Sequence, residues 1–403
     1  SDPCARGPRD WNDVPVAGRP SRPLRVLAYA DSTIFSGAES LFCELVSGLA
    51  SDPGFEVSVA APEPNRRLHD ALLEATGTSA AIHVPAQQLP LAALFLHDPR
   101  RTRAVRKALS GLDVDVILVN LPSAEYGATP LVVRRPAGVP AVGVMHISRT
   151  MEELDFRLGG LRTGIARRAI RRLDRVCMLS HTAAAAFRRD WDAPSVATDV
   201  FHMPEPKFER QDRDEARKRL GLPAGEVLVA TIGRLTARQK GQDVLIQAAP
   251  AVVAAHPEVR FVFAGEGRDH EMLEELTRQH GVPDHFTFLG QVEDVQGLLS
   301  AVDLIAIPSR FEGLPLVALE ALAAGVPGIA SSVDGIVDVW PGEWLVWPDD
   351  PAALSRSLIG LIEAESGERS KLLESGHKMM KGNVADRAYE DVAVSIRRAA
   401  GHG

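Results

Sequence analysis

The stretch SRFEGLPLVALEALAAGVPGIAS, residues 309–331, combines a loop with an almost wholly apolar segment. Pro315 suits the first turn of a helix, where its missing N–H costs nothing, and Gly325 followed by Pro327 is a usual way to end one. The sequence therefore predicts a helix, PLVALEALAA, at 315–324. Because a helix that is apolar on all sides is normally buried, we expect this helix to lie inside the fold.

Two glutamates stand out in this segment, Glu312 in the loop and Glu320 in the helix. Glu320 is the only charged residue of the predicted helix, and a buried carboxylate is costly unless a protein group, an ordered water or a ligand satisfies it. Glu312 lies before the helix, beside backbone N–H groups that have no partner within it. A structural explanation stays open for both residues: a carboxylate bonded to a neighbouring loop, and a charge favoured by the helix dipole.

Short apolar runs alternate with helical patterns along the chain, which is typical of parallel α/β layering. The predicted strands are 24–30, 57–61, 116–120, 141–145 and 175–179 in the first half, and 227–233, 260–265, 286–290, 304–307 and 328–330 in the second. We therefore expect an α/β fold with two doubly wound, Rossmann-like parallel-sheet domains facing each other across a cleft. Open sheets of this kind bind ligands at the carboxyl ends of their strands.

The predicted boundaries divide the chain into five segments. They are a disordered N-terminal arm at 1–23, a first domain at 24–205, a linker at 206–222, a second domain at 223–385, and a C-terminal helix at 386–403 that packs back on the first domain.

Composition narrows the class of protein. Hydrophobic residues make up 45% and charged residues 24% of 403 residues, as in an ordinary soluble globular protein. The net charge of −8 argues against nucleic acid as the main partner. The chain has neither a membrane-length apolar run nor the apolar core of a secretory signal, so a cytoplasmic location is expected. Cys43 and Cys177 sit in apolar patterns without disulfide or zinc spacing, and we expect them to be buried.

Three cations, Arg234, Arg238 and Lys240, lie in the loop after the strand predicted at 227–233. Cations at the carboxyl end of a strand and next to a helix N-terminus suit a phosphate, and a solvated basic loop is the alternative. The turn SGAE at 36–39 is a weaker candidate for an anion site, because tight turns also need glycine for steric reasons. It is not the G-x-G-x-x-G of dinucleotide folds, so a nicotinamide enzyme is disfavoured.

With these segments placed, the chain resembles the retaining nucleotide-sugar glycosyltransferases of family 4, which have the GT-B fold. The matching motifs are SGAES (36–40), VMHIS (144–148), LDRVCMLSHTAAAAF (173–187), GRLTARQKGQD (233–243), AGEGR (264–268) and FEGLPLVALEALAAGVPGIAS (311–331). Their order and spacing together make the likeness specific from about residue 24 to residue 360.

The resemblance implies transfer of a sugar from a nucleoside diphosphate sugar to an acceptor hydroxyl, with retention of the anomeric configuration. The first domain would bind the acceptor and the second domain the donor, a UDP- or GDP-sugar. Attack and departure would use the same face of the sugar, so no protein nucleophile, cofactor or metal ion is implied. The acceptor would be a glycan, a lipid-linked alcohol or a small natural-product alcohol.

The resemblance also implies roles for the charged residues. Arg234 and Lys240 would hold the donor diphosphate and neutralise charge that grows on the leaving group. Glu320 would accept hydrogen bonds from the ribose hydroxyls, and Glu312 would face the hydroxyls of the donor sugar. His146, after the strand at 141–145, would lie near the reacting sugar. These roles make His146, Glu312, Arg234 and Lys240 the catalytic candidates.

Four further residues complete the predicted donor site. The backbone N–H groups of Gly313 and Leu314 would lie near sugar or phosphate, and Gly37 would let backbone approach the diphosphate. Arg238 would share the diphosphate, because Arg234 and Lys240 are six positions apart where five is commoner in the family.

Two other departures from the family pattern concern single residues. Ser36 replaces the first glycine of the family's G-G-x-E turn, and Asp338 stands where the family often has a glutamate. These departures, the Arg234–Lys240 spacing included, bear on the identity of the donor more than on the type of reaction.

Three other charged segments have competing interpretations. Asp113 and Asp115 form a D-x-D pattern, but we expect no metal site there because the pair only leads into a strand. The PDDP segment at 348–351 is expected to cap a helix. The arginine-rich helix 161–175 is expected to present a solvated face; the alternative is contact with an anionic membrane at the inner face or with a phosphorylated acceptor.

Other activities on the same fold stay open. An epimerase or a hydrolase of nucleotide sugars would use the same donor site, and so would a sugar-nucleotide binder without catalysis. The loops 85–100 and 147–160 are expected to shape the acceptor pocket, but no motif in them names the acceptor.

Overall fold

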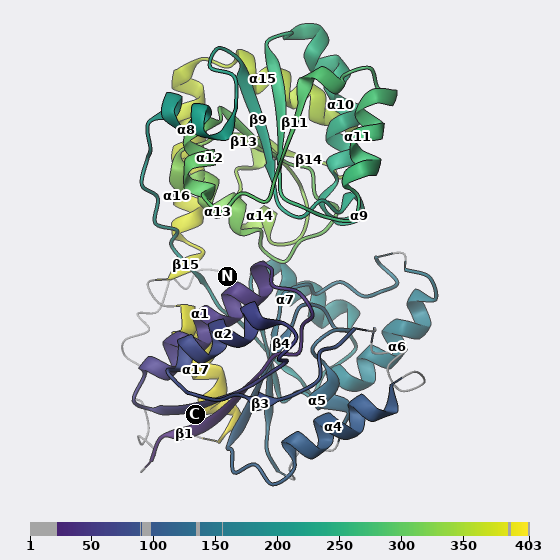
Figure 1. Ribbon diagram of the computed structural model, residues 1–403, viewed down its shortest axis with the longest axis vertical. Helices are drawn as coiled ribbons and strands as arrows, with labels where there is room; N and C mark the ends of the chain where they lie inside the picture. The colour runs from purple at the N-terminus through teal and green to yellow at the C-terminus, as the bar shows by residue number, and fades with distance from the viewer. Residues whose placement is uncertain are drawn as a thin grey trace, which may run out of the picture.

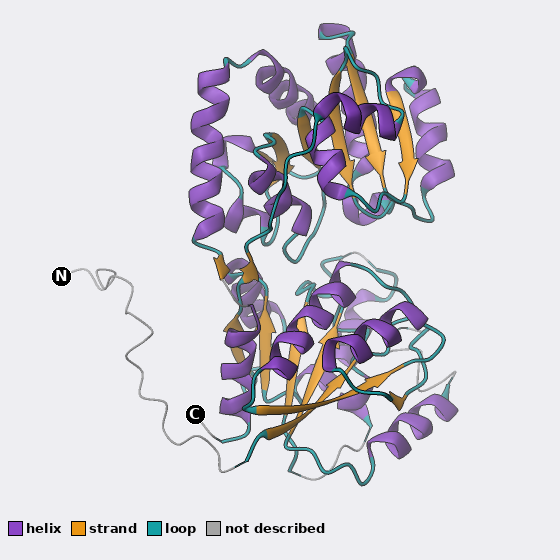
Figure 2. Ribbon diagram, turned by 60° about the vertical axis from the view of Figure 1, so that its left-hand side comes forward, coloured by secondary structure: helices purple, strands orange, loops and turns teal. Residues whose placement is uncertain are grey.

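The computed structural model describes residues 22–88, 90, 98–133, 138–154, 156–385 and 388–401 (Figure 1). Residues 1–21 of the predicted N-terminal arm lie outside this described part of the chain. Two units, each built on a parallel sheet flanked by helices, lie one above the other (Figures 1 and 2). The predicted pair of Rossmann-like domains is confirmed.

The first sheet is parallel and has seven strands in the order β3-β2-β1-β4-β5-β6-β7. The strands are β1 Leu24–Tyr29, β2 Phe55–Ala61, β3 Ile82–His83, β4 Val116–Leu121, β5 Ala141–Met145, β6 Arg175–Met178 and β7 Ala197–Val200. The helices of this half are α1 Gly37–Ser51, α2 Arg66–Thr76, α4 Pro99–Leu109, α5 Thr129–Val132, α6 Gly159–Ile170 and α7 His181–Asp190.

The second sheet is parallel and has six strands in the order β11-β10-β9-β12-β13-β14. The strands are β9 Val227–Ile232, β10 Val259–Ala264, β11 Phe286–Gly290, β12 Leu304–Ile307, β13 Gly328–Ser331 and β14 Leu345–Val346. The helices of this half are α8 Arg213–Leu220, α9 Ala237–Lys240, α10 Gln242–Ala255, α11 His270–Gln279, α12 Val295–Ala301, α13 Leu316–Ala324, α14 Ile336–Val339, α15 Pro351–Glu363 and α16 Ser366–Lys381.

The ten predicted strands are all present, with ends shifted by at most two residues. Most of the strands that the sequence did not predict, such as β3 and β14, have only two residues, which is too short to show a periodic pattern. The predicted stripe of α1 is also confirmed, since Leu41, Phe42, Leu45, Val46 and Leu49 are all buried. The free thiols of Cys43 and Cys177 are buried as expected, and burial raises the pKa of each to about 12.

Helix α13 is the helix predicted from the opening stretch. It begins after Pro315 and ends at Gly325, which adopts the left-handed backbone conformation (φ 69°) that glycine accepts without steric cost. Ala318, Leu319 and Ala321 are completely buried. The local signals for a helix start and stop, together with the continuous apolar composition, therefore determine this element.

The chain passes twice between the two units. Strand β8 (Met203–Pro204) pairs in parallel with β15 (Val384–Ala385) near this passage (Figure 2). Helix α17 (Ala388–Ala399) then lies against α1 and the first sheet, where Arg397 Nη2 is 3.0 Å from Asp52 Oδ2. Within residues 206–222, α8 packs on α12 of the second unit.

Two charged segments interpreted from sequence serve the fold. Asp115 accepts hydrogen bonds from Arg22 Nη1 at 2.8 Å and from the backbone N–H of Arg25, and these arginine contacts lower its pKa. In the described part of the chain no group of three acidic, histidine or cysteine residues is placed to hold a metal ion. Asp350 caps α15 as predicted, since its side chain accepts from Ala353 N at 2.8 Å.

Candidate functional site

The loops that follow β5 and β6 of the first sheet meet the loops that follow β9, β12 and β13 of the second, and we call these contacts the domain junction. Gly313 lies so close to the loop after β5 that a Cβ there would be 1.9 Å from the carbonyl oxygen of His146. At Gly37, where α1 begins, a Cβ would lie 3.8 Å from Leu316 Cδ1 at the start of α13. His146 and Gly313 therefore meet at the junction, and Gly37 lies near the start of α13.

His146 follows β5 directly and is buried. Its Nε2 lies 2.8 Å from Asn120 Oδ1, and burial lowers its pKa to about 3. The imidazole is therefore neutral at physiological pH, and the contact with the amide oxygen is met when Nε2 carries the proton. Asn120 was missed from sequence, although a polar residue at the end of the apolar run VILVN was a usable signal.

Lys240 and Glu312 form the central charged pair of the second unit. Lys240 Nζ lies 2.6 Å from Glu312 Oε1, and the same oxygen accepts a 2.7 Å hydrogen bond from Ser309 Oγ. Glu312 is 6% exposed, so the protein itself meets the need of this buried carboxylate for partners. Gly233, with φ 142°, leaves room beside the Lys240 side chain.

The two predicted arginines of the loop after β9 are placed differently. Arg234 is exposed, and its side chain has no hydrogen bond or ion pair with the described residues. Its backbone carbonyl accepts a 2.9 Å hydrogen bond from Gln242 Nε2. Arg238 instead crosses the junction, where it donates to the carbonyl of Leu154 and lies over the ring of Phe156, 4.5 Å from the centroid. Of these two arginines, Arg238 contacts the first domain, whereas the side chain of Arg234 forms no such contact with the described residues.

Glu320 projects from α13 and is partly buried. No described residue forms a hydrogen bond or ion pair with its carboxylate, and burial raises its pKa. Leu314, which follows Gly313 in the loop before α13, is 7% exposed. Its backbone was predicted to approach the donor. The sequence argument required a partner for Glu320, and the described part of the protein does not provide one.

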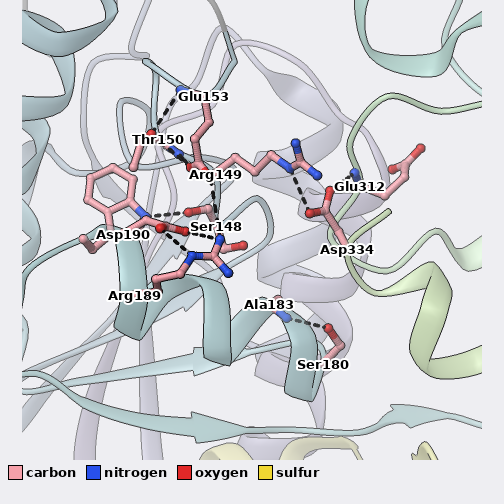
Figure 3. A network of polar contacts seen from close by, with 11 residues as sticks. Ser148, Arg149, Thr150, Glu153, Ser180, Ala183, Arg189, Asp190, Glu312 and Asp334 are labelled. Atoms are coloured by element: carbon pink, nitrogen blue, oxygen red, sulfur yellow. Dashed lines mark hydrogen bonds and ion pairs between the residues drawn. The ribbon is translucent and has the colours of Figure 1, made fainter. Parts of the chain in front are cut away.

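Three contacts at the junction involve residues that sequence reasoning missed or assigned no contact. Asp334 Oδ2 accepts from the backbone N–H of Glu312 at 2.7 Å, and Asp334 Oδ1 accepts from Arg149 Nε at 2.9 Å (Figure 3). Asp338 Oδ1 accepts a 2.6 Å hydrogen bond from Thr182 Oγ1, at the start of α7. These aspartates connect the loop after β13 to the first domain.

Two family models match this chain. A model described as "Glycosyl transferase 4-like domain" matches residues 36–204, and one described as "Glycosyl transferases group 1" matches residues 226–364. The first match covers the strands β2 to β7 of the first sheet but not β1, and the second match covers all six strands of the second sheet.

Two relatives and one solved structure illustrate the similarity. The phosphatidyl-myo-inositol mannosyltransferase of Mycolicibacterium smegmatis is 28% identical over 89% of this chain and 90% of its own length. The lipopolysaccharide core biosynthesis mannosyltransferase LpsB of Rhizobium meliloti is 30% identical over 55% of this chain and 68% of its own length. With some other relatives the match covers only about two fifths of their length.

The solved structure is that of Anabaena Alr3699/HepE in complex with UDP-glucose. It superposes with a TM-score of 0.73 at 19% identity, covering 93% of this chain and all of that one, which shows the common fold. The chain belongs to the family 4 glycosyltransferases, nucleotide-sugar enzymes of the GT-B fold.

Proposed function

We propose that this glycosyltransferase moves a sugar from a UDP- or GDP-sugar to an acceptor hydroxyl with retention of the anomeric configuration. The observation that carries the proposal concerns three charged sites of the second unit. Glu320 and Arg234 have no side-chain partner among the described residues, and the Lys240–Glu312 pair lies in the same unit. A nucleoside diphosphate brings ribose hydroxyls that donate hydrogen bonds and phosphates that need cations, so one ligand meets both needs.

In this proposal donor binding rearranges the Lys240–Glu312 pair. Lys240 turns from the carboxylate to a phosphate oxygen, and Arg234 adds a second cation to the diphosphate. Glu312, released from Lys240 but still held by Ser309, then accepts hydrogen bonds from hydroxyls of the donor sugar. These cations stabilise the charge that develops on the leaving diphosphate as the glycosidic bond breaks.

The transfer step proposed here needs no protein nucleophile. The acceptor oxygen forms the new glycosidic bond on the face from which the nucleoside diphosphate leaves, and a phosphate oxygen takes the acceptor's proton. His146 stays neutral, and its Nδ1 has no hydrogen-bond partner among the described residues, so it is available to a sugar or acceptor hydroxyl. We further propose that no metal ion is required, which an unchanged rate after treatment with a chelator would support.

A two-step experiment tests the proposed reaction. Nucleoside diphosphates and then nucleotide sugars are screened by thermal shift, because a ligand stabilises the protein in proportion to the logarithm of its excess over Kd. The best donor is then incubated with acceptor panels, and products are analysed by NMR. An acceptor glycoside with the donor's anomeric configuration supports the proposal. An isomerised donor or free sugar would favour the epimerase or hydrolase, and tight binding without turnover would favour a binder.

We also propose a lipid-linked acceptor, reached by contact with an anionic membrane surface. Two relatives carry names of glycolipid pathways, namely phosphatidyl-myo-inositol and lipopolysaccharide core. Helix α4 supports this proposal, because it carries four exposed cations that have no ion pair within the described residues: Arg100, Arg103, Arg106 and Lys107. No helix in the described ranges is long and apolar enough to cross a bilayer.

The arginines of segment 161–175 are used largely inside the protein. Arg162 pairs with Glu125, Arg171 with Asp192, and Arg175 with Asp199. Arg172 Nη1 donates to the carbonyl of Leu131 at 2.9 Å. These contacts disfavour this segment as the main surface for a membrane, so the proposal moves that role to α4.

A further inference from the structure

A chain of contacts crosses the domain junction from the interior of the first domain to Glu312 (Figure 3). The completely buried Trp191 donates its indole N–H to the carbonyl of Ser148. On the other side of Arg149, both the backbone N–H and the hydroxyl of Thr150 donate to Glu153 Oε2, at 2.8 and 3.0 Å. The backbone is therefore held on both sides of Arg149, so its side chain extends from a fixed loop.

Asp334 binds the Arg149 side chain and also binds the backbone of Glu312, in the loop after β12. Arg149 Nε donates to Asp334 Oδ1 at 2.9 Å, and the backbone N–H of Glu312 donates to Asp334 Oδ2 at 2.7 Å. Both carboxylate oxygens are thus occupied, one by each domain. Asp334 adopts a positive φ of 41°, a conformation that favours glycine over residues with a side chain. Aspartate is among the side chains that adopt this conformation most readily, and here its carboxylate forms both hydrogen bonds.

We propose that Arg149 and Asp334 are positioning residues that set Glu312 against His146 for sugar transfer, an inference that rests on the proposed function. Arg149 follows His146 by three positions in the same loop, so its bond to Asp334 fixes this loop relative to the backbone of Glu312. The next residue, Gly313, lies against the carbonyl of His146. The side chains of His146, proposed to lie beside the reacting sugar, and of Glu312, proposed to face the donor sugar, are thereby held in a fixed relative position.

A second contact between the domains, from Thr182 to Asp338, makes it possible to distinguish a positioning role of Arg149 and Asp334 from a role in holding the domains together. Thr182 donates to Asp338 through its backbone N–H at 3.0 Å and its hydroxyl at 2.6 Å, without involving Arg149 or Asp334. Loss of the Arg149 side chain therefore leaves an independent tie between the domains. What it releases is the Glu312 loop, and the expected defect is in the reaction step rather than in domain association.

Three variants test the two hydrogen bonds of Asp334 separately and together. Arg149→Leu removes the contact with the first domain, and Asp334→Asn keeps an acceptor for the Glu312 N–H but presents an amide NH₂ to Arg149. Asp334→Gly removes both hydrogen bonds and accepts the positive φ, so it should fold. We expect kcat to fall about tenfold in the first two variants and about a hundredfold in the third, because small displacements of reacting groups have effects of this size. Nucleoside diphosphate affinity should stay within about twofold, since Lys240, Arg234 and Glu320 are retained.

Amide hydrogen exchange gives a readout that requires no substrate. Arg149→Leu and Asp334→Gly should each speed exchange in a peptide covering 309–315, which contains the Glu312 N–H, without speeding it in α1. The matched control is Arg188→Leu, an exposed arginine of α7 without an ion pair to the described residues. It should change neither kcat nor exchange.

The outcomes distinguish the positioning role from the proposed function. Unchanged exchange at 309–315 in Arg149→Leu would overturn the positioning role whether or not a substrate is known. Unchanged kcat in Arg149→Leu and Asp334→Asn, beside an active wild type, would overturn it as well. Absence of sugar transfer by the wild type itself, across the donor and acceptor panels, would instead contradict the proposed function.

Discussion

Glu312 lies in the loop before α13 and Glu320 lies within α13, but the described residues provide partners for the carboxylate of Glu312 and none for that of Glu320. Glu312 is bound by Lys240 and Ser309, and its backbone N–H is held by Asp334. Glu320 is partly buried, its pKa is raised by burial, and no described residue bonds its side chain. A paired carboxylate is oriented in advance, whereas an unpaired one retains a desolvation cost that a ligand can remove.

The same contrast separates α4 from the arginine-rich segment 161–175, which was predicted to be one helix but is helical only to Ile170, with Arg175 in β6. The arginines of segment 161–175 mostly bind carboxylates and carbonyls of the protein, whereas four cations of α4 stay exposed without an ion pair in the described residues. Judged by their positive charge alone, both segments would be candidate surfaces for an anionic partner. The structure shows which of these charges have partners among the described residues and which have none.

The largest effect is expected from removing the Lys240 side chain, because this should change both the affinity for the nucleotide and the stability of the protein. Lys240→Ala should lower nucleoside diphosphate affinity about a hundredfold or more by calorimetry, since a charge-assisted phosphate contact is lost. It should also destabilise the protein by about 1–3 kcal/mol, because Glu312 is left as a buried charge without its cation.

Lys218→Ala is the control for Lys240→Ala, since Lys218 is an exposed lysine of α8 without an ion pair to the described residues. It should change neither property. Adding Glu312→Gln to Lys240→Ala should restore most of the lost stability without restoring affinity. Full affinity in Lys240→Ala would remove Lys240 from the diphosphate site.

A smaller effect is expected at α4, where unpaired charge is proposed to meet a membrane. Replacing Arg103, Arg106 and Lys107 together by Gln should weaken binding to vesicles with anionic lipid by roughly a hundredfold, at about 1 kcal/mol per cation near the surface. Vesicle co-sedimentation at low salt measures this. Replacing Arg167, Arg168 and Arg172 together by Gln provides the comparison, and an equal loss there would contradict the distinction between the two segments.

His146 is intermediate between the paired Glu312 and Glu320, which has no partner in the described part of the chain. Its Nε2 contacts Asn120, while its Nδ1 has no partner among the described residues. Its pKa is lowered to about 3, below the ordinary value of about 6.5, so the unfolded chain takes up a proton as pH falls through 6.5 while the folded protein does not. Between pH 7 and pH 5 the free energy of unfolding should therefore fall by about 2 kcal/mol more in wild type than in His146→Gln.

Urea titrations at the two pH values measure this difference, with His280→Gln, at an exposed position, as the control. A pH dependence that is the same in wild type and His146→Gln would show that the buried histidine does not remain neutral.

The elements of the fold were readable from the sequence because their signals are local. Gly325 and Pro315 bound α13, and apolar runs located β1 and β9 to within one residue. The charged candidates were readable as well, since Lys240 and Glu312 follow predicted strands and meet at 2.6 Å.

The residues that sequence analysis missed depend on contacts between distant segments. Asp334 accepts a hydrogen bond from Arg149, 185 positions away, and Asn120 contacts His146, the residue that follows the neighbouring strand β5. No periodicity marks such pairs. Whether a charge is already paired was equally hidden, because Arg238 and Arg234 look alike in sequence and only Arg238 reaches Leu154 and Phe156 of the first domain.

The most direct test of the account is to measure Glu320→Gln twice, by calorimetry with the nucleoside diphosphate found in the screen and by urea unfolding without ligand. Because Glu320 has no partner in the described protein, the variant should be as stable as wild type or more stable by up to about 1 kcal/mol. Its affinity for the nucleotide should fall by roughly 10- to 100-fold, as charge-assisted hydrogen bonds to the ribose weaken. Unchanged affinity together with lost stability would instead make Glu320 a structural carboxylate and contradict the account.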